Sequence, residues 1–352
     1  MARAKKVRSQ SKTATAENHI ENDEFVNELQ SQKLRLVDFI ESHSVDHIPV
    51  LFEPVLVSLL QMRPDRPVIV DATLGEAGHS RGMLRLVPNA TIIGIDRDPF
   101  MIERAKSRLQ KDGFVIADRP QTGAVHIVNA GFDSIQEVLL SLSLQADFVL
   151  ADFGVSVHHF ATADRGFSFR DSVLDMRLDP ALPVTASDIV NRYSADDLST
   201  LLLQYGQERL ARQIAASIVA ARPIHSASAL TDAVLSALIR DRNRRKIRRF
   251  ITDQDAARVF QALRIKVNGE LQQIESFVGQ IPEILADGGR AALISFHSLE
   301  DRLVKVGFQS LRNAGFRILT KKAIEPTDAE VALNPKSRSA KLRIIEKSAE
   351  AV

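Results

Sequence analysis

The stretch VIVDATLGEAGHSRGML, residues 68–84, decides the fold of this chain. Its three opening β-branched residues predict a short buried strand, which ends at Asp71. Gly75 and Gly78 then interrupt the pattern, and a helix is expected from Ser80. A strand, a glycine turn and a helix in this order point helix N–H groups at a ligand.

A second predicted strand, Thr91–Ile95, also ends in an acid, Asp96. Two consecutive strands that end in carboxylates around a glycine turn indicate a nucleoside site, in which the second acid accepts hydrogen bonds from ribose hydroxyls. Asp71, Gly75 and Asp96 are therefore candidate cofactor residues.

The turn lacks the G-x-G-x-x-G spacing of dinucleotide sites, and the chain has no G-x-x-x-x-G-K-[ST] phosphate loop. A turn with fewer glycines needs to pass only an adenosine and an amino-acid tail, so S-adenosylmethionine fits it. The alternative is an ordinary βαβ unit with a purely structural turn.

The composition excludes several kinds of chemistry. The 352 residues include no cysteine, so disulfides, thiolate zinc sites and a cysteine nucleophile are ruled out. His158 and His159 lack a third ligand at matching spacing, so no metal is expected. No apolar run reaches the roughly 18 residues of a membrane span, and we expect a cytoplasmic protein without a membrane partner.

An α/β pattern continues along the chain and is interrupted once. Further strands are predicted at 125–128, 146–151, 290–295, 316–320 and 341–346, and a loop at 111–124. Between the fourth and fifth strands, residues 188–219 and 227–239 are helical in period. We therefore expect a Rossmann-like sheet with a mostly helical insert that recognises the substrate.

Four segments follow from this pattern. They are a basic tail with an N-terminal helix (1–46), the first part of the sheet domain (47–155), the helical insert (156–256) and the second part of the sheet domain (257–352).

Beyond the basic tail, positive charge is concentrated in two places, although the formal net charge is only +2. Between Arg240 and Arg249, seven of ten residues are Lys or Arg and one is acidic. A second basic strip contains Lys336, Arg338, Lys341 and Arg343. A charge run is usually a solvated face, but this density favours contact with RNA phosphates.

With these segments in place, the chain resembles the bacterial 16S ribosomal RNA cytosine-N4 methyltransferases, the ribosomal small subunit methyltransferase H family. The resemblance covers residues from His47 to about Lys347. The motifs that carry it are HIPVL (47–51), DATLGEAGHS (71–80), GIDRDP (94–99), RGFSFR (165–170), LDMRLD (174–179), FQALRIKVNGEL (260–271), ISFHSLEDRLVK (294–305) and NPKSRSAKLR (334–343).

The resemblance implies a class I methyltransferase fold with a helical domain inserted after the fourth strand. It implies transfer of a methyl group from S-adenosylmethionine to the N4 amine of a cytidine in the decoding region of 16S ribosomal RNA. The family's cofactor contacts fall on Ala77, Gly78 and His79 in the turn, on Asp96 at the ribose, and on Phe132, Asp152 and His159.

The chain departs from the family pattern at two points. Ala77 stands where the family has a glycine, and a positive φ there would be costly. After Asp152 the family typically reads L-G-V-S-S-P-Q-L-D, whereas this chain reads FGVSVHHFA, so that His159 occupies the place of a glutamine.

Two further clusters are candidates for substrate binding. Arg165, Phe167, Phe169 and Arg170 combine cations with aromatics, which suits an unstacked base and its phosphates, although a packed loop is an equal alternative. A polar cluster after the fifth strand and one residue of the C-terminal strip complete the set: Ser295, His297, Asp301, Arg302 and Arg338.

Asp152 is expected to face the methyl group or the amine, with a turn cap as the alternative. No residue is assigned as a general acid or base.

Two other functions stay open at this point. One is a non-catalytic RNA-binding or ribosome-assembly factor that keeps the fold. The other is a methyltransferase with a different RNA or a protein as acceptor. The expected partner is 16S ribosomal RNA within the small subunit, and a homodimer is left open.

Overall fold

A computed structural model describes residues 49–62, 65–154, 165–246 and 250–349. The chain divides into two compact units. The sheet unit comprises the chain up to Phe153 and from Ile274 onward, and the helical unit comprises Gly154–Gln273. The tail and helix predicted within residues 1–46 lie outside the described residues. None of the helices in the described ranges combines the length and apolar character that a bilayer crossing requires.

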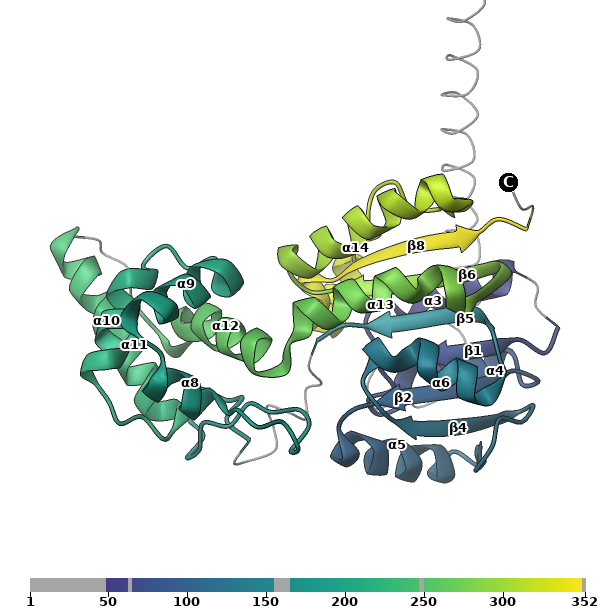
Figure 1. Ribbon diagram of the computed structural model, residues 1–352, viewed down its shortest axis with the longest axis horizontal. Helices are drawn as coiled ribbons and strands as arrows, with labels where there is room; N and C mark the ends of the chain where they lie inside the picture. The colour runs from purple at the N-terminus through teal and green to yellow at the C-terminus, as the bar shows by residue number, and fades with distance from the viewer. Residues whose placement is uncertain (1–48, 63–64, 155–164, 247–249, 350–352) are drawn as a thin grey trace, which may run out of the picture. The chain divides into compact units, whose positions relative to one another are not determined.

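Eight strands form the sheet of the sheet unit, in the order β3-β4-β2-β1-β5-β6-β8-β7 (Figure 1). Their bounds are β1 Val68–Asp71, β2 Thr91–Asp96, β3 Val115–Ile116, β4 Ala124–Asn129, β5 Ala146–Asp152, β6 Leu285–Ser295, β7 Phe316–Ile318 and β8 Lys341–Lys347. Neighbouring strands pair in parallel except at β8, which is antiparallel to β6 and to β7. This confirms the predicted Rossmann-like class I sheet.

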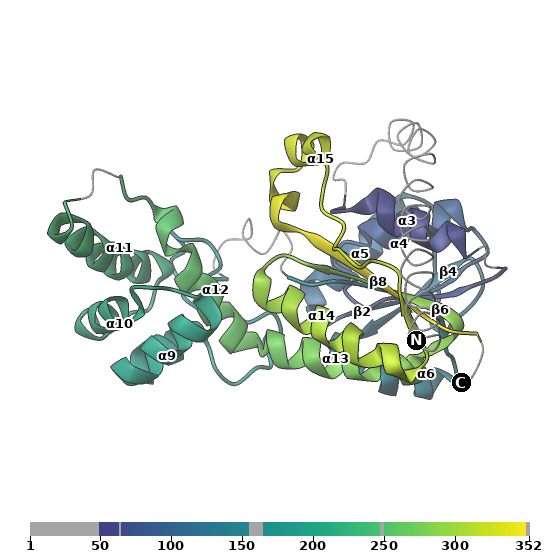
Figure 2. The same ribbon diagram turned by 90° about the horizontal axis from the view of Figure 1, so that it is seen from above.

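Helices cover both faces of the sheet (Figure 2). Their bounds are α3 Phe52–Gln61, α4 Gly78–Leu86, α5 Pro99–Lys111, α6 Ile135–Leu142, α13 Glu270–Ile284, α14 Ser298–Leu311 and α15 Asp328–Leu333, with short 3₁₀ turns η1 Phe132–Ser134, η3 Arg312–Ala314 and η4 Pro335–Ser339. Helices α3, α4 and α5 pack on one face, and α6, α13 and α14 pack on the other.

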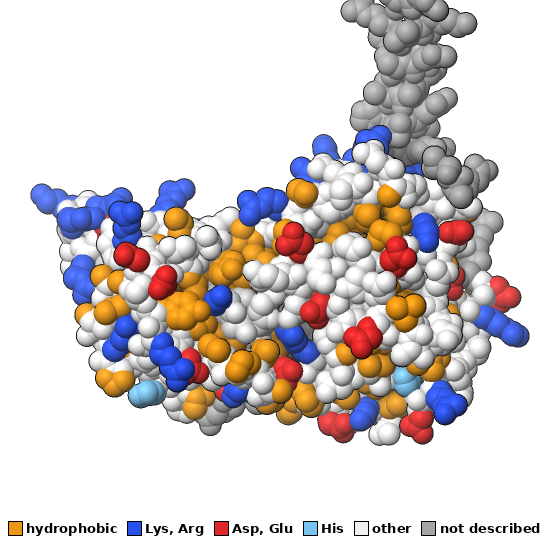
Figure 3. Space-filling model, in the orientation of Figure 1, with side chains coloured by type: hydrophobic (Ala, Val, Ile, Leu, Met, Phe, Trp, Pro, Cys, Tyr) orange, Lys and Arg blue, Asp and Glu red, His pale blue; other side chains and the backbone are white. Residues whose placement is uncertain are grey.

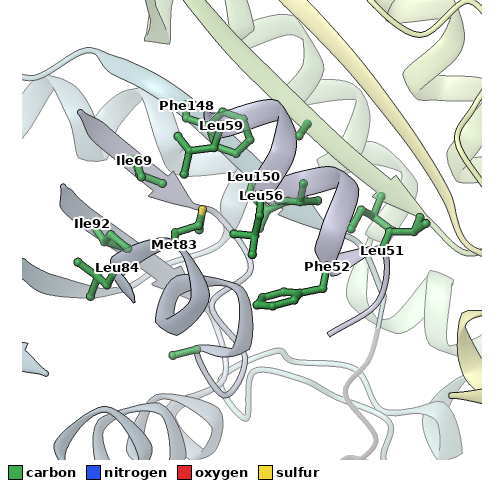
Figure 4. Packing of buried hydrophobic residues seen from close by; sticks show 14 of the residues in the cluster. Leu51, Phe52, Leu56, Leu59, Ile69, Met83, Leu84, Ile92, Phe148 and Leu150 are labelled. Atoms are coloured by element: carbon green, nitrogen blue, oxygen red, sulfur yellow. The ribbon is translucent and has the colours of Figure 1, made fainter. Parts of the chain in front are cut away.

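Alternation along the central strands explains the two layers, because successive side chains of a strand point to opposite faces. Ile69 of β1 belongs to the core under α3 and α4, whereas the next residue, Val70, belongs to the core under α6, α13 and α14. Figure 4 shows Leu59 of α3 near Phe148 and Ile69 of the sheet, and Leu56 of α3 near Leu150 of β5. Such strands are apolar on both sides, which is why they appear in the sequence as continuous apolar runs.

The helical unit has its own core. It contains α8 Ala186–Arg192, α9 Ala195–Gly206, α10 Ala211–Ala220, α11 Ala227–Arg244, the 3₁₀ turn η2 Asp253–Ala256 and α12 Ala257–Asn268. The predicted helical region 188–219 is thus three helices, since extended residues at Tyr193 and Ser194 and a left-handed Gln207 interrupt it. Asn268, at the end of α12, holds the loop that precedes α8. Its side chain donates to the Met176 carbonyl and accepts from Leu178 N.

The helical unit extends further along the chain than the predicted boundary at residue 256. Helix α12 packs on α9, and its Val259, Phe260 and Leu263 lie in the core of the helical unit. Periodicity indicates an apolar face on such a helix but does not say which core receives it.

Two local predictions were wrong. Residues 111–124 are not only a loop, because β3 pairs with β4 at the edge of the sheet. With two residues, one of them half exposed, β3 is too short for a period-2 pattern. Helix α4 starts at Gly78 rather than Ser80, because Ala77 already takes the N-cap position.

Candidate functional site

The candidate site lies where the carboxyl ends of β1, β2 and β5 meet. Strand β1 pairs with β2 on one side and β5 on the other, so the sheet order reverses at this point. Ligands of open α/β sheets bind in the crevice at such a switch point. The three strands end in Asp71, Asp96 and Asp152, as the sequence predicted.

The turn between β1 and α4 is tightly folded. Its Ala77 N–H donates to the Leu74 carbonyl at 2.7 Å, and Gly75 and Ala77 both have positive φ, +53° and 59°. A left-handed alanine costs about 1–2 kcal/mol relative to glycine-compatible geometry. Ala77 therefore adopts the positive φ that is costly for a residue with a Cβ, and the buried turn tolerates it.

Gly78 brings the turn against the chain that precedes α3. A Cβ added at Gly78 would lie 2.8 Å from Cγ of Pro49. This close approach accounts for a glycine at the first position of α4.

Asp96 is held by two backbone donors. Its Oδ2 accepts from Gly75 N at 2.8 Å, and its Oδ1 accepts from Asp98 N at 2.9 Å. Each oxygen retains a further lone pair. The carboxylate is thus oriented as a bidentate acceptor, which matches the vicinal hydroxyls of a ribose.

Asp71 is a buried carboxyl group beneath the turn. Its Oδ2 accepts from the Ser80 hydroxyl at 2.7 Å, and the residue is 2% exposed. Burial raises the pKa of Asp71 from 3.8 to about 6, although the hydrogen bond from Ser80 opposes the shift. Asp71 therefore holds the start of α4 through its hydrogen bond with Ser80, and it carries a poorly solvated negative charge at neutral pH.

Asp152 has the most unusual environment of the three acids. Its backbone N–H donates to the Thr73 hydroxyl at 2.6 Å, which ties the ends of β1 and β5 together. Within the described part of the chain, its buried Oδ1 has no hydrogen-bond partner. Burial, with the charges of Asp71 and Glu300, raises the pKa of Asp152 well above its ordinary value. A cationic or N–H-bearing ligand group would supply what this oxygen lacks.

His79 is buried and takes part in local packing. It is 6% exposed, and its Nε2 lies 3.2 Å from the Val50 carbonyl, so that nitrogen must carry the proton. Burial lowers the pKa of His79 to about 4, and its ring packs 5.8 Å from that of Phe52. In this structure His79 fastens α4 to the segment before α3, and its predicted cofactor contact remains a prediction.

Phe132 lies in an aromatic cluster at the edge of the site. Its ring centroid is 5.4 Å from Phe153 and 5.7 Å from Phe277. Phe132 is half-buried, whereas the other two rings are fully buried. The cluster gives Phe132 a fixed position after β4, from which its accessible side can pack on a flat ligand. His159, the remaining predicted cofactor contact, lies outside the described residues.

The polar cluster after β6 is engaged in local structure. The Ser295 hydroxyl lies 3.4 Å from the Lys341 carbonyl. His297 caps α14, since its Nδ1 accepts from Glu300 N, and its Nε2 lies 3.1 Å from Glu300 Oε1. Asp301 forms a two-point ion pair with Arg343, at 2.7 and 3.1 Å. Arg302 is exposed.

The cluster Arg165 to Arg170 is packed rather than open. Phe167 is 3% exposed, and Phe169 meets Phe260 edge-to-face at 4.9 Å. Arg165 donates to the carbonyls of residues 177 and 178, and exposed Arg170 pairs with the carboxylates of residues 253 and 232. The packed-loop alternative thus fits the two aromatics, while substrate contact by the two arginines remains a prediction. Arg338 is exposed on η4.

Sequence reasoning missed several residues that support the site. Thr73 joins β1 to β5 through its hydrogen bond with Asp152 N. In the sequence, only its position between Asp71 and the glycine turn indicates that it belongs to the site. Glu76 binds Arg104 and Arg108 of α5, the latter at 2.8 Å, and so ties the turn to the helix after β2. Glu330 of α15 accepts from Leu51 N at 2.7 Å. Such partners are distant in sequence, so no local pattern predicts them.

A model of the MraW methylase family matches residues 44–348. The chain belongs to the MraW methylase family. The predicted family, the methyltransferase class and S-adenosylmethionine as the cofactor are thereby confirmed.

Similar proteins cover nearly the whole chain. The ribosomal RNA small subunit methyltransferase H of Trichormus variabilis is 41% identical over 88% of this chain and 95% of its own length. The protein of the same name from Synechococcus elongatus is 42% identical over 89% of this chain and 98% of its own length. An rRNA methylase structure from Streptococcus thermophilus is 10% identical over 86% of this chain and 99% of that one, with a TM-score of 0.40. The fold assignment rests on the strand order of the sheet and not on this last similarity.

Proposed function

We propose that this methylase transfers the methyl group of S-adenosylmethionine to the N4 amine of a cytidine in the decoding region of 16S ribosomal RNA. The observation that carries the proposal is the 41–42% identity, over almost the full length, to relatives named ribosomal RNA small subunit methyltransferase H. The absence of cysteine supports a nitrogen acceptor, because attack by an exocyclic amine needs no covalent enzyme adduct.

The residues at the strand ends fit this cofactor. Asp96 would hold the ribose, because both its oxygens are already aimed by backbone donors. Phe132 would pack on the adenine, and Asp152 would face the methionine end with its unpartnered oxygen. When bound, the cofactor supplies a methyl group on a positively charged sulfur.

The protein's part in the reaction is mainly alignment and electrostatics. The N4 lone pair of cytosine is delocalised into the ring, so the amine is a weak nucleophile. Asp152 Oδ1 can accept an N–H of that amine or of the cofactor's ammonium group, which orients the group and stabilises its positive charge. The proton that the amine loses can pass to water, and no residue is assigned as its base.

The helical unit would recognise the RNA, as its position between the two parts of the sheet unit in the sequence suggests. A substrate in the small ribosomal subunit implies a cytoplasmic site of action. The target base must be flipped out or single-stranded, because N4 is otherwise paired. The homodimer remains a prediction.

The test is transfer of labelled methyl from S-adenosylmethionine to purified 30S subunits that lack this modification, followed by digestion to nucleosides. Label in N4-methylcytidine is the expected result. Label in another nucleoside or in protein would refute the acceptor, and absence of both label and cofactor binding would favour a non-catalytic RNA-binding factor. The Asp152→Ala protein, with its fold checked by circular dichroism, should lose most of the transfer.

A further inference from the structure

The end of α11 is the most strongly basic described surface of the helical unit. Five cations occupy it, Arg240, Arg242, Arg244, Arg245 and Lys246, and Figure 3 shows Lys and Arg side chains gathered at the extremity of this unit. Exposed like charges at this density repel one another, which is tolerated where an anionic partner is bound.

The surface keeps a positive excess after its own ion pairs are counted. Asp241 is the single acid between residues 240 and 250, and it pairs with Arg244 at 2.6 Å and with Arg245 at 2.9 Å. Asp241 is only 8% exposed, so its charge lies beneath the arginines rather than beside them. The outer layer therefore presents guanidinium and ammonium groups to solvent.

Phe250 follows the basic run and is 89% exposed, the highest value among the exposed large apolar side chains of the described residues. Single exposed apolar residues are common and need no explanation by themselves. Here the chain is held just after the ring, because Asp255 Oδ2 accepts from Thr252 N at 2.8 Å and Asp253 pairs with Arg170 at 2.7 Å. The aromatic ring thus follows the last described cation of α11 by four residues and directly precedes an anchored turn.

Cations that lie within a few residues of an accessible aromatic ring match single-stranded nucleic acid. The cations bind the backbone phosphates, and an unstacked base stacks on the face of the aromatic ring. Double-stranded RNA offers phosphates but keeps its bases stacked, so it would use the cations and not the ring.

We propose that the end of α11 together with Phe250 is a docking surface for a single-stranded segment of the substrate RNA, separate from the strand-end site of the sheet unit. The proposal rests on the proposed function in one respect, namely that the acceptor is RNA. It adds the kind of RNA and the residues that hold it. Phe250 stacks on a base, and the α11 cations bind the flanking phosphates.

The experiment measures binding of a fluorescent 20-nucleotide unstructured RNA and of a 20-base-pair RNA duplex, without cofactor and at several salt concentrations. Phe250→Ala should weaken single-strand binding between about fivefold and a hundredfold and leave duplex binding unchanged. Phe250→Trp should retain it. Arg242→Gln with Lys246→Gln should weaken both, and the slope of log K against log salt should fall by about 0.7 per cation for the single strand.

Matched controls exclude general effects. Phe100→Ala removes an exposed phenylalanine from the sheet unit, and Leu203→Ala removes an exposed apolar side chain from α9 of the helical unit. Lys106→Gln with Lys111→Gln removes two cations from α5, of which Lys111 is exposed and Lys106 is half-buried. All of these should bind both RNAs as the unmodified protein does, with unchanged melting temperature.

The outcomes separate this proposal from the proposed function. If Phe250→Ala and the cation variant bind both RNAs normally, the docking surface is refuted, and contact with a protein becomes the better account of this patch. In methyl transfer to 30S subunits, Phe250→Ala should raise KM and leave kcat unchanged. In another outcome, the unmodified protein transfers no methyl group while the Phe250→Ala and cation variants still bind RNA more weakly than it does. That result would support the docking surface and refute the proposed reaction.

Discussion

Replacement of Asp71 by asparagine should change how the stability of the sheet unit depends on pH. Asp71 is 2% exposed, and burial raises its pKa from 3.8 to about 6. A group whose pKa is raised in the folded state stabilises that state most when it is protonated. Its contribution is therefore complete below pH 3.8 and is lost as the pH rises through about 6.

The size of the effect follows from the shift. A difference of about two pKa units corresponds to about 3 kcal/mol, half of which is already lost at pH 5. The amide of Asp71→Asn does not titrate and can still accept from Ser80. Relative to the unmodified protein, the variant should therefore gain about 1.5 kcal/mol of stability between pH 5 and pH 7.5.

The assay must report on the sheet unit. The chain has no tryptophan, and both its tyrosines, Tyr193 and Tyr205, lie in the helical unit, so near-ultraviolet signals report on the other unit. Hydrogen exchange of a peptide that contains β1, measured across the pH range with urea, gives the required free energy of unfolding.

Equal pH dependence in the two proteins would refute the reasoning, because it would mean that Asp71 is solvated or paired with a cation. Glu137→Gln, at an exposed site on α6, is the control and should not alter the slope. The charge of Asp71 contributes to the raised pKa of Asp152. Repeating the comparison in an Asp152→Asn background therefore separates the contributions of the two carboxyl groups to the pH dependence.

Three further changes test the packing and the site. Gly82→Ala should cost about 1–3 kcal/mol in urea unfolding, because the new Cβ would lie 2.3 Å from the phenyl ring at the start of α3. Gly279→Ala, with nothing within 4 Å of the added Cβ, should instead stabilise by about 0.5–1 kcal/mol, and similar losses in both would contradict this account. Asp301→Asn should lower stability by about 3 kcal/mol, because it leaves Arg343, whose side chain is 11% exposed, without its carboxylate, and an added Arg343→Met should recover most of the loss. Binding of S-adenosylhomocysteine should lower the raised pKa of Asp152, since its ammonium group favours the charged form, so binding should release protons in the pH range where the free carboxyl group is still protonated. Calorimetry in buffers of different ionisation enthalpy should show less release for Asp152→Asn, and equal release would exclude Asp152 as the source.

Three residues of the candidate site could be predicted from sequence, because each stands at the carboxyl end of a strand. Asp71, Asp96 and Asp152 each come directly after an apolar run, and parallel strands bring their carboxyl ends to one edge.

Other predicted site residues could not be placed from sequence, because their surroundings come from distant segments. His79 is buried against the carbonyl of Val50, and Phe167 is packed in the core of the helical unit. Arg170 is partly neutralised by Asp253, which is far from it in sequence. A residue type shows what chemistry is available, whereas burial and pairing decide whether it faces a ligand.

By itself, the sequence determined the α/β class, the positions of most strands along the chain, the interruption by a helical segment and the family, because each is encoded in local periodicity or in contiguous motifs. The tertiary structure decided which core receives α12, that β8 runs antiparallel beside β6, and that Asp152 has a buried oxygen without a partner in the described chain. It also decided that Phe250 is almost fully exposed. These features depend on desolvation and on contacts between segments far apart in the chain, and no local pattern of residues contains that information.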